Sequence, residues 1–260
     1  MRRIIGALGA LTLAVVMALP AGAATTTVVV GGDTAAAEND PGGWLFNRDA
    51  STSTPYEFTN DEASLGSGSV YIEPIGGANE DDKFIAELFV LKPIADIESF
   101  SYDFLIGSGG DASDENEFYL NVYANFGESD ADKFYDCRYN IVPTTGSTSD
   151  WTTVTFDPTQ TYPVTTRGSS PHGCPASPAD MDLDSPGSTI RVFALNVGDT
   201  SLNDVGLDGY LDNVVLTANG DTTIYDFAHK DDCKKDGWAA YDYPSFRNQG
   251  QCIKYLNTGK

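Results

Sequence analysis

The chain has 260 residues, of which 41% are hydrophobic, and this is enough apolar material for one substantial globular core. Its formal net charge at pH 7 is −23, carried by residues 24–228, whereas residues 229–260 have a small excess of basic side chains. An acidic body repels nucleic acid and anionic lipid, so we expect neither as a partner.

The N-terminal residues have the pattern of an export signal. Arg2 and Arg3 precede an apolar run from Ile4 to Leu19, and small residues end the segment at Ala23. This order is typical of a secretory signal peptide covering residues 1–23. The run is short for a bilayer span, and no later apolar stretch approaches the necessary length. We therefore predict a secreted, extracellular protein without membrane insertion.

Short strand-like runs follow between turn-rich clusters, and no segment has a convincing helical period. An early β-branched run, Thr25 to Val30, lies in a lead-in of residues 24–41. The pattern predicts an all-β fold, an antiparallel jelly-roll β-sandwich over residues 42–228, with a disulfide-closed C-terminal extension over residues 229–260. The predicted strands are Ser69–Ile75, Phe84–Leu91, Ile97–Ile106, Glu117–Ala124, Phe134–Val142, Trp151–Phe156, Ile190–Val197 and Gly209–Ala218.

Two of these runs alternate strictly between apolar and polar residues, which assigns one face of each to the core. The even positions of the first run should be buried, leaving Glu117, Tyr119, Asn121, Tyr123 and Asn125 outward. In the second run Tyr135, Cys137, Tyr139 and Ile141 should point inward and Asp136, Arg138 and Asn140 outward.

If these two strands are neighbours, their polar faces merge into one patch of Tyr119, Asn121, Tyr123, Arg138 and Asn140. Aromatic ring faces suit the C–H side of a pyranose, and amide and guanidinium groups suit its hydroxyls. The patch therefore predicts a ligand-binding surface for carbohydrate. The alternative is that a second layer of chain covers this face and buries the tyrosines.

The four cysteines of an exported chain should be oxidised, and they allow three pairings. We predict that sequence neighbours pair, Cys137 with Cys174 and Cys233 with Cys252. A zinc site is disfavoured, because the chain has no C-x-x-C spacing and only His172 and His229 as further ligands.

Clustered aspartates suggest a second kind of site. Asp180, Asp182 and Asp184 would lie on one side of an extended segment, where their oxygens could gather around calcium. A solvated acidic loop is the alternative. The same two interpretations apply to an acidic turn that contains Asp199, Asp204 and Asp208.

Catalytic signatures are incomplete. A glycosidase needs two suitably spaced carboxylates, and only Glu87 and Glu117, predicted mid-strand on outward faces, qualify for a test. Neither His172 nor His229 accompanies a Ser or Cys in a recognisable nucleophile turn. A non-catalytic protein is favoured, with a glycoside hydrolase-like enzyme as one alternative.

Several segments occur in an order that resembles carbohydrate-binding jelly-roll modules of the galactose-binding-like kind. They are Trp44, the strand Gly68 to Ile72, the strand Ser99 to Leu105, the strand opened by Trp151, and the closing strand Gly209 to Thr217. The resemblance covers residues 42–218, and its most specific element is the aliphatic-Asp-Asn-Val pattern around Asp212. It implies that Asp212 helps to bind a structural calcium near the chain ends. The stretch Ser147 to Pro186 has no counterpart in that family.

The C-terminal segment around Cys233 and Cys252 is similar to a short cysteine-closed tail that ends many exported bacterial proteins. That resemblance implies no established function. Together the residues and the resemblances predict a secreted, non-catalytic module that binds an extracellular glycan or cell-wall polymer and holds structural calcium. A structural or adhesive cell-surface protein, in which the sandwich is only a scaffold, is the main alternative.

Overall fold

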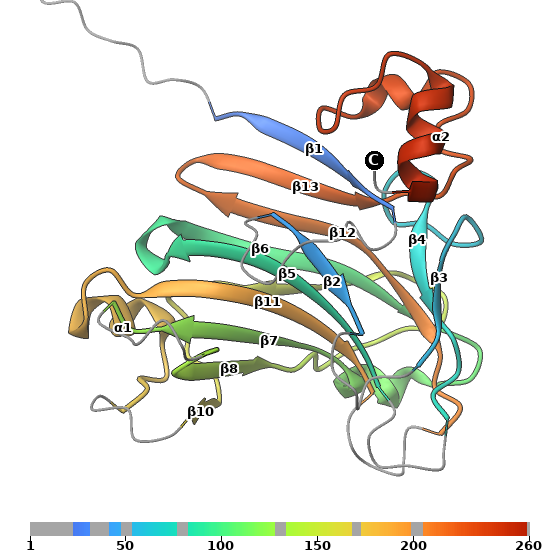
Figure 1. Cartoon of the computed structure of the whole chain (residues 1–260). Helices are drawn as coiled ribbons and strands as arrows, with labels where there is room; N and C mark the ends of the chain where they lie inside the picture. The colour runs from blue at the N-terminus through green and yellow to red at the C-terminus, as the bar shows by residue number, and fades with distance from the viewer. Residues whose placement is uncertain are drawn as a thin grey trace, which may run out of the picture.

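Two β-sheets packed face to face form the body of the protein in the computed structural model (Figure 1). The structure describes residues 23–31, 42–47, 54–76, 83–127, 134–167, 173–198 and 205–258. Most of the predicted signal peptide, together with His172, Asp199 and Asp204, lies outside these residues.

The first sheet has seven strands within the described residues and is built around β12, which pairs with β13, β4 and β6. At its edges β1 pairs with β13, β3 with β4, and β9 with β6. Every pairing is antiparallel except that of β1 with β13, which is parallel. The strands are β1 (Thr25–Val30), β3 (Tyr56–Thr59), β4 (Ser69–Ile72), β6 (Ile97–Ile106), β9 (Thr152–Phe156), β12 (Gly209–Ala218) and β13 (Asp221–Phe227).

The second sheet has six strands in the order β10-β8-β7-β11-β5-β2, all antiparallel. The predicted all-β sandwich is therefore confirmed. The strands are β2 (Trp44–Phe46), β5 (Phe84–Pro93), β7 (Phe118–Asn125), β8 (Cys137–Ile141), β10 (Val164–Thr166) and β11 (Thr189–Val197).

Helices are few and short, and the sequence, in which no segment has a convincing helical period, did not indicate them. Ser177 precedes Pro178 at the first position of α1 (Pro178–Asp184), a place where proline's fixed φ favours helix. In the tail, α2 (Gln249–Thr258) carries Cys252. None of the described helices is long and apolar enough to cross a membrane. The 3₁₀ turns are η1 (Ile94–Asp96), η2 (Ala112–Glu117) and η3 (Gly237–Ala240).

The core lies between the two sheets, where the alternation of the strands places their apolar sides. Phe100 of β6 stacks on Phe193 of β11 with ring centroids 4.0 Å apart and planes 3° from parallel. Phe104 of the same sheet stacks on Phe118 at the start of β7 at 4.8 Å. Both pairs bridge the sheets, so aromatic side chains set how the two layers face each other.

The tail docks on one end of the seven-stranded sheet, beside β1 and β13 (Figure 1). Cys233 and Cys252 are fully buried in a small apolar cluster that also includes Val29 of β1. A Cβ on Gly31 would lie 2.1 Å from a methyl group of Leu256 in α2, so a larger residue there would require the Leu256 side chain to move. The tail therefore has its own small hydrophobic cluster, to which the sandwich contributes Val29.

Candidate functional site

The structure brings the predicted polar patch together. β7 and β8 are antiparallel neighbours, with Asn121 opposite Asn140 and Tyr123 opposite Arg138 (Figure 1). The even positions of β7 are buried, as the alternation predicted. Directly opposed side chains on one face lie about 5 Å apart, so these groups form one continuous surface.

This surface is hollowed. A pocket of about 370 Å³ is lined by Tyr119, Asn121, Arg138 and Asn140. Its volume is within the range of small-ligand sites, roughly 300–1,000 Å³. Three further residues complete its lining, from the chain before β5, from η2 and from the end of β8: Lys83, Asn116 and Val142. The sequence did not indicate Lys83 or Asn116, because their approach to β8 depends on how distant segments pack.

Two polar atoms of this pocket's residues lack partners. Arg138 Nε and Asn140 Oδ1 are shielded from water and have no hydrogen-bond partner among the described residues. Leaving such a group unsatisfied costs about 1–3 kcal/mol.

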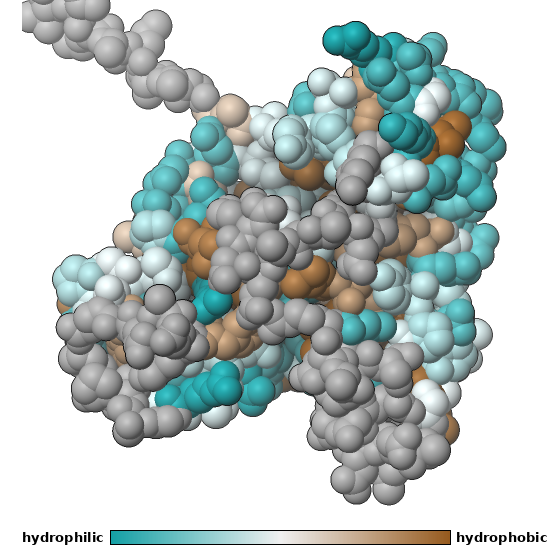
Figure 2. Space-filling view, viewed as in Figure 1, coloured by the Kyte–Doolittle hydropathy of each residue, from teal (hydrophilic) through white to brown (hydrophobic). Residues whose placement is uncertain are grey.

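Tyr123 does not line the pocket. Its ring packs against Phe134 at 5.2 Å and Tyr135 at 4.9 Å, and burial raises its pKa to about 12. It borders an apolar cluster centred on Phe89 and Val192. On the face seen in Figure 2, hydrophilic residues lie over β8 and hydrophobic residues show towards the centre. Tyr123 therefore borders the polar surface but does not line the pocket.

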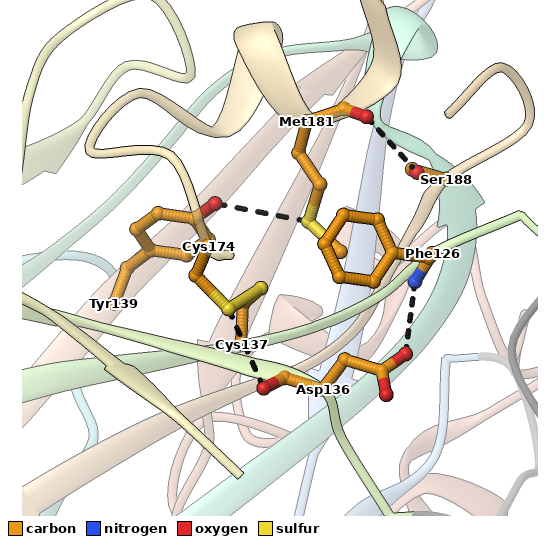
Figure 3. Close-up of a disulfide and its surroundings, with 7 residues drawn as sticks. All are labelled: Phe126, Asp136, Cys137, Tyr139, Cys174, Met181 and Ser188. Carbon is orange, nitrogen blue, oxygen red and sulfur yellow. Dashed lines mark hydrogen bonds between the residues drawn. A yellow bond between two sulfur atoms is a disulfide. The ribbon is translucent and has the colours of Figure 1, made fainter. Parts of the chain in front are cut away.

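The inward and outward assignment before Cys137 is wrong. Tyr135, predicted to be buried, lies against Tyr123 and under the guanidinium of Arg167, whose carbon is 5.2 Å from its ring centre. Asp136, predicted outward, is buried and accepts a hydrogen bond from the backbone N–H of Phe126 (Figure 3). β8 begins only at Cys137, so the period of two does not extend back to these residues.

A disulfide holds β8 from its core side. Cys137 is bonded to Cys174 with an S–S distance of 2.05 Å, and the neighbouring Tyr139 hydroxyl donates to Met181 Sδ at 3.7 Å (Figure 3). Met181, on α1, is fully buried in the core. The second disulfide joins Cys233 and Cys252, so both predicted pairings are confirmed. Covalent and packing contacts therefore fix the strand that carries Arg138 and Asn140.

Asp212 lies elsewhere, on the outer side of the seven-stranded sheet, and is fully buried. Its Oδ2 accepts hydrogen bonds from the backbone N–H groups of Ser64 and Leu65 at 2.8 and 2.7 Å. Burial raises its pKa to about 7, with the negative charge of Asp103 adding to the effect. Its Oδ1 has no partner among the described residues, so the carboxylate fits a role as cation ligand.

The other aspartates do not form the arrangement expected for them. Asp180, Asp182 and Asp184 lie on helix α1, not on an extended segment, so residues two apart point in different directions. Asp182 instead accepts from the Gly187 N–H at 2.9 Å. Asp208 accepts from the Tyr71 hydroxyl at 3.0 Å and from the Gly109 N–H. Within the described ranges no group of three His, Cys, Asp or Glu residues could hold a metal ion.

Glu87 and Glu117 are both buried, and only Glu87 lies within a strand, opposite Ala194 of β11. Glu117 ends the 3₁₀ turn η2, so its predicted mid-strand position is wrong. Its Oε1 accepts from the side-chain amide of Asn116 at 2.9 Å. The two glutamates thus occupy different kinds of element instead of facing each other across a pair of strands.

No family model and no curated protein matches the chain. Solved structures do. It is similar to a family 11 carbohydrate-binding module from Clostridium thermocellum in complex with a mixed-linked β-1,3-1,4 tetrasaccharide. The identity is 13% and the TM-score 0.41, and the match covers 72% of this chain and 90% of the module. It is also similar to the CBM22-1 xylan-binding domain of Paenibacillus barcinonensis Xyn10C, with 11% identity, TM-score 0.38, and 69% and 89% covered.

These two neighbours are carbohydrate-binding modules. At such identities and scores the likeness concerns the general β-sandwich architecture alone.

Proposed function

We propose that this protein is a secreted, non-catalytic module that binds carbohydrate in the pocket of Tyr119, Asn121, Arg138 and Asn140. The observation that carries the proposal is the hollow itself, which the amides of Asn121 and Asn140 and the guanidinium of Arg138 line beside the partly exposed ring of Tyr119. A sugar offers both hydroxyls for the polar atoms and a C–H face for the ring.

Secretion is part of this proposal. It is supported by the signal-peptide pattern of residues 1–23 and by the two disulfides, which persist in oxidising compartments. The body is acidic, whereas the pocket residues Lys83 and Arg138 are basic and would also suit an acidic sugar. A glycan panel should therefore contain neutral xylan and β-glucan and also an acidic polyuronate.

Isothermal titration calorimetry against that panel tests the pocket. We expect at least one glycan to bind, and we expect Tyr119→Ala and Arg138→Ala each to weaken binding about tenfold or more, equivalent to about 1.4 kcal/mol. Leu183→Ala, an exposed site on α1, is the matched control. Binding that survives both pocket substitutions unchanged, or no binding by any glycan of the panel, contradicts the proposal.

We also propose that Asp212 helps to hold a structural calcium ion. Its buried, unpartnered Oδ1 supports this assignment, and bound calcium would supply positive charge to a carboxylate that burial otherwise disfavours. A chelator should lower the melting temperature of the wild-type protein, and calcium should restore it. In Asp212→Asn the melting temperature should no longer respond to either. A wild-type melting curve that ignores both additions removes calcium from the proposal.

A further inference from the structure

The opposite face of the sandwich carries a row of aromatic side chains. On the outer side of the seven-stranded sheet, Tyr71 of β4 is the cross-strand partner of Tyr210 on β12, and Tyr210 is the partner of Leu105 on β6. The pairing of Phe104 with Thr152 brings Trp151, just before β9, level with Leu105. The row thus crosses four adjacent strands, about 14 Å at roughly 4.8 Å per strand.

The rings form a continuous but twisted surface. The centroids of Tyr71 and Tyr210 are 4.9 Å apart with planes 39° from parallel, and Trp151 meets Tyr210 at 6.4 Å and 63°. Leu105, almost completely buried, lies between Tyr210 and Trp151 in the row. All three rings are partly exposed. Because the ring planes turn from one ring to the next, the row suits a single twisted polysaccharide chain better than the flat surface of a crystalline polysaccharide.

Polar groups run alongside the rings. Two residues further along the strands, the next row of outward-facing residues contains Asp103. Asp103 accepts hydrogen bonds from Thr153 at 2.6 Å and from Asn213 at 2.9 Å. Thr153 is exposed. Ser64 also donates to Asp103 through its hydroxyl, so this network places hydroxyl and amide groups beside the aromatic row.

The charge around the rings is negative. Glu57 of β3 is the cross-strand partner of Tyr71, and Asp208 accepts from the Tyr71 hydroxyl. Burial raises the pKa of Tyr210, and the nearby charges of Asp61 and Glu62 raise it further. A uronic-acid polymer would meet like charge here, so the surface selects against anionic glycans.

We propose that the row of Tyr71, Tyr210 and Trp151 is a second glycan-binding surface, one that takes a single chain of a neutral polysaccharide across the strands of the seven-stranded sheet. This goes beyond the pocket on the six-stranded sheet and does not depend on it, because the two surfaces lie on opposite outer faces of the sandwich. A protein with both surfaces would hold two glycan chains at once.

Tryptophan fluorescence separates the two surfaces. The chain has three tryptophans: Trp44 is buried in the core, Trp238 packs in the tail cluster, and Trp151 alone belongs to the row. No tryptophan lines the Tyr119 pocket. Titration with soluble xylan, mixed-linked β-glucan or galactan should therefore change the emission of Trp151 only if a chain stacks on the row. Polygalacturonate should give no change.

The variants to compare are Tyr71→Ala, Tyr71→Phe and Trp151→Phe. We expect Tyr71→Ala to weaken the fluorescence-detected binding about tenfold, since stacking is lost, and Tyr71→Phe to retain it, since only the hydroxyl is removed. Trp151→Phe should abolish the signal while calorimetry still detects binding. Tyr243→Ala removes an exposed aromatic ring away from the row and serves as the control.

Arg138→Ala should leave the Trp151 signal intact, so failure of the pocket and failure of this surface are distinguishable. The inference is overturned if neutral glycans leave the emission unchanged. It is also overturned if Tyr71→Ala and Tyr243→Ala bind alike while both keep the wild-type circular dichroism spectrum.

Discussion

Asn121 and Asn140 are direct cross-strand partners, one on β7 and the other on β8, and both side chains line the same pocket. Asn121 is buried, whereas Asn140 is partly exposed and its Oδ1 has no partner among the described residues. The pairing means that one sugar ring would contact both amides at once.

The first prediction follows from that pairing. Asn121→Ala and Asn140→Ala should each weaken glycan affinity about 3–10-fold, the value of a neutral hydrogen bond of roughly 0.5–1.5 kcal/mol. Because one ligand contacts both, the double variant should lose less than the product of the two single losses. Calorimetry on the four proteins measures this coupling, with Asn257→Ala on α2 as an exposed control. Fully additive losses would show that the two amides act independently, against a single ligand that contacts both.

The second prediction concerns the aromatic contact between the sheets. Phe193 is fully buried against Phe100, so Phe193→Ala should lower the free energy of unfolding by about 3–5 kcal/mol. Leu183, 78% exposed, should change it by less than about 0.5 kcal/mol when replaced by alanine. Urea denaturation followed by circular dichroism measures both. Equal effects would mean that the ring pair does not hold the two layers together.

The third prediction compares the two disulfides. Cys137 and Cys174 are 37 residues apart and Cys233 and Cys252 are 19 apart, so the first closes the longer loop. Replacing both members of a pair by alanine should cost about 2–4 kcal/mol, with the larger loss for the first pair. Only the first replacement should also weaken glycan binding, since it releases β8. If the tail pair alone affected binding, the tail would have to be part of the site.

The fourth prediction is a pH dependence of stability in the metal-free protein. Burial raises the pKa of Asp226 from 3.8 to about 7, and the charges of Asp212 and Asp232 add to the shift. Below about pH 4 both the folded and the unfolded state carry the proton. Between pH 4 and 7 the unfolded state loses it first, so the free energy of unfolding falls as the pH rises, and above 7 the loss is complete.

Melting temperatures measured from pH 4 to 8 in the presence of a chelator check this. Asp226→Asn should make the slope shallower over that interval, because an amide stays neutral in both states, while Asp212, whose pKa is also raised to about 7, keeps part of it. Asp184→Asn, at an exposed site, should keep the wild-type slope. A slope as steep in Asp226→Asn as in the wild type would assign the titration to another group.

Much of the architecture could be predicted from local pattern. The alternation in Phe118 to Asn125 gave the correct buried side, because a period of two has only one way to face a core. The hairpin from β12 to β13 was missed, although Asn219 and Gly220 both have positive φ at its turn and Asn-Gly is a strong hairpin signal.

The errors have physical reasons. The seven-residue helix α1 is too short to show a period, so its aspartates were placed on an extended segment. The start of β8 depends on where the preceding chain leaves the sheet, which alternation alone cannot define, and this misplaced Tyr135 and Asp136. Lys83 and Asn116 reach the pocket only through tertiary packing. Five polar positions were therefore predictable as a face, but the hollow within that face was not.

The parallel pairing of β1 with β13 has a mechanical consequence. Thr25 lies opposite Thr222 and Val30 opposite Phe227, so a pull on the N-terminal end of β1 and an opposite pull on the tail after Phe227 would draw the two strands along each other. In that geometry the hydrogen bonds between the two strands bear the load together, instead of breaking one after another.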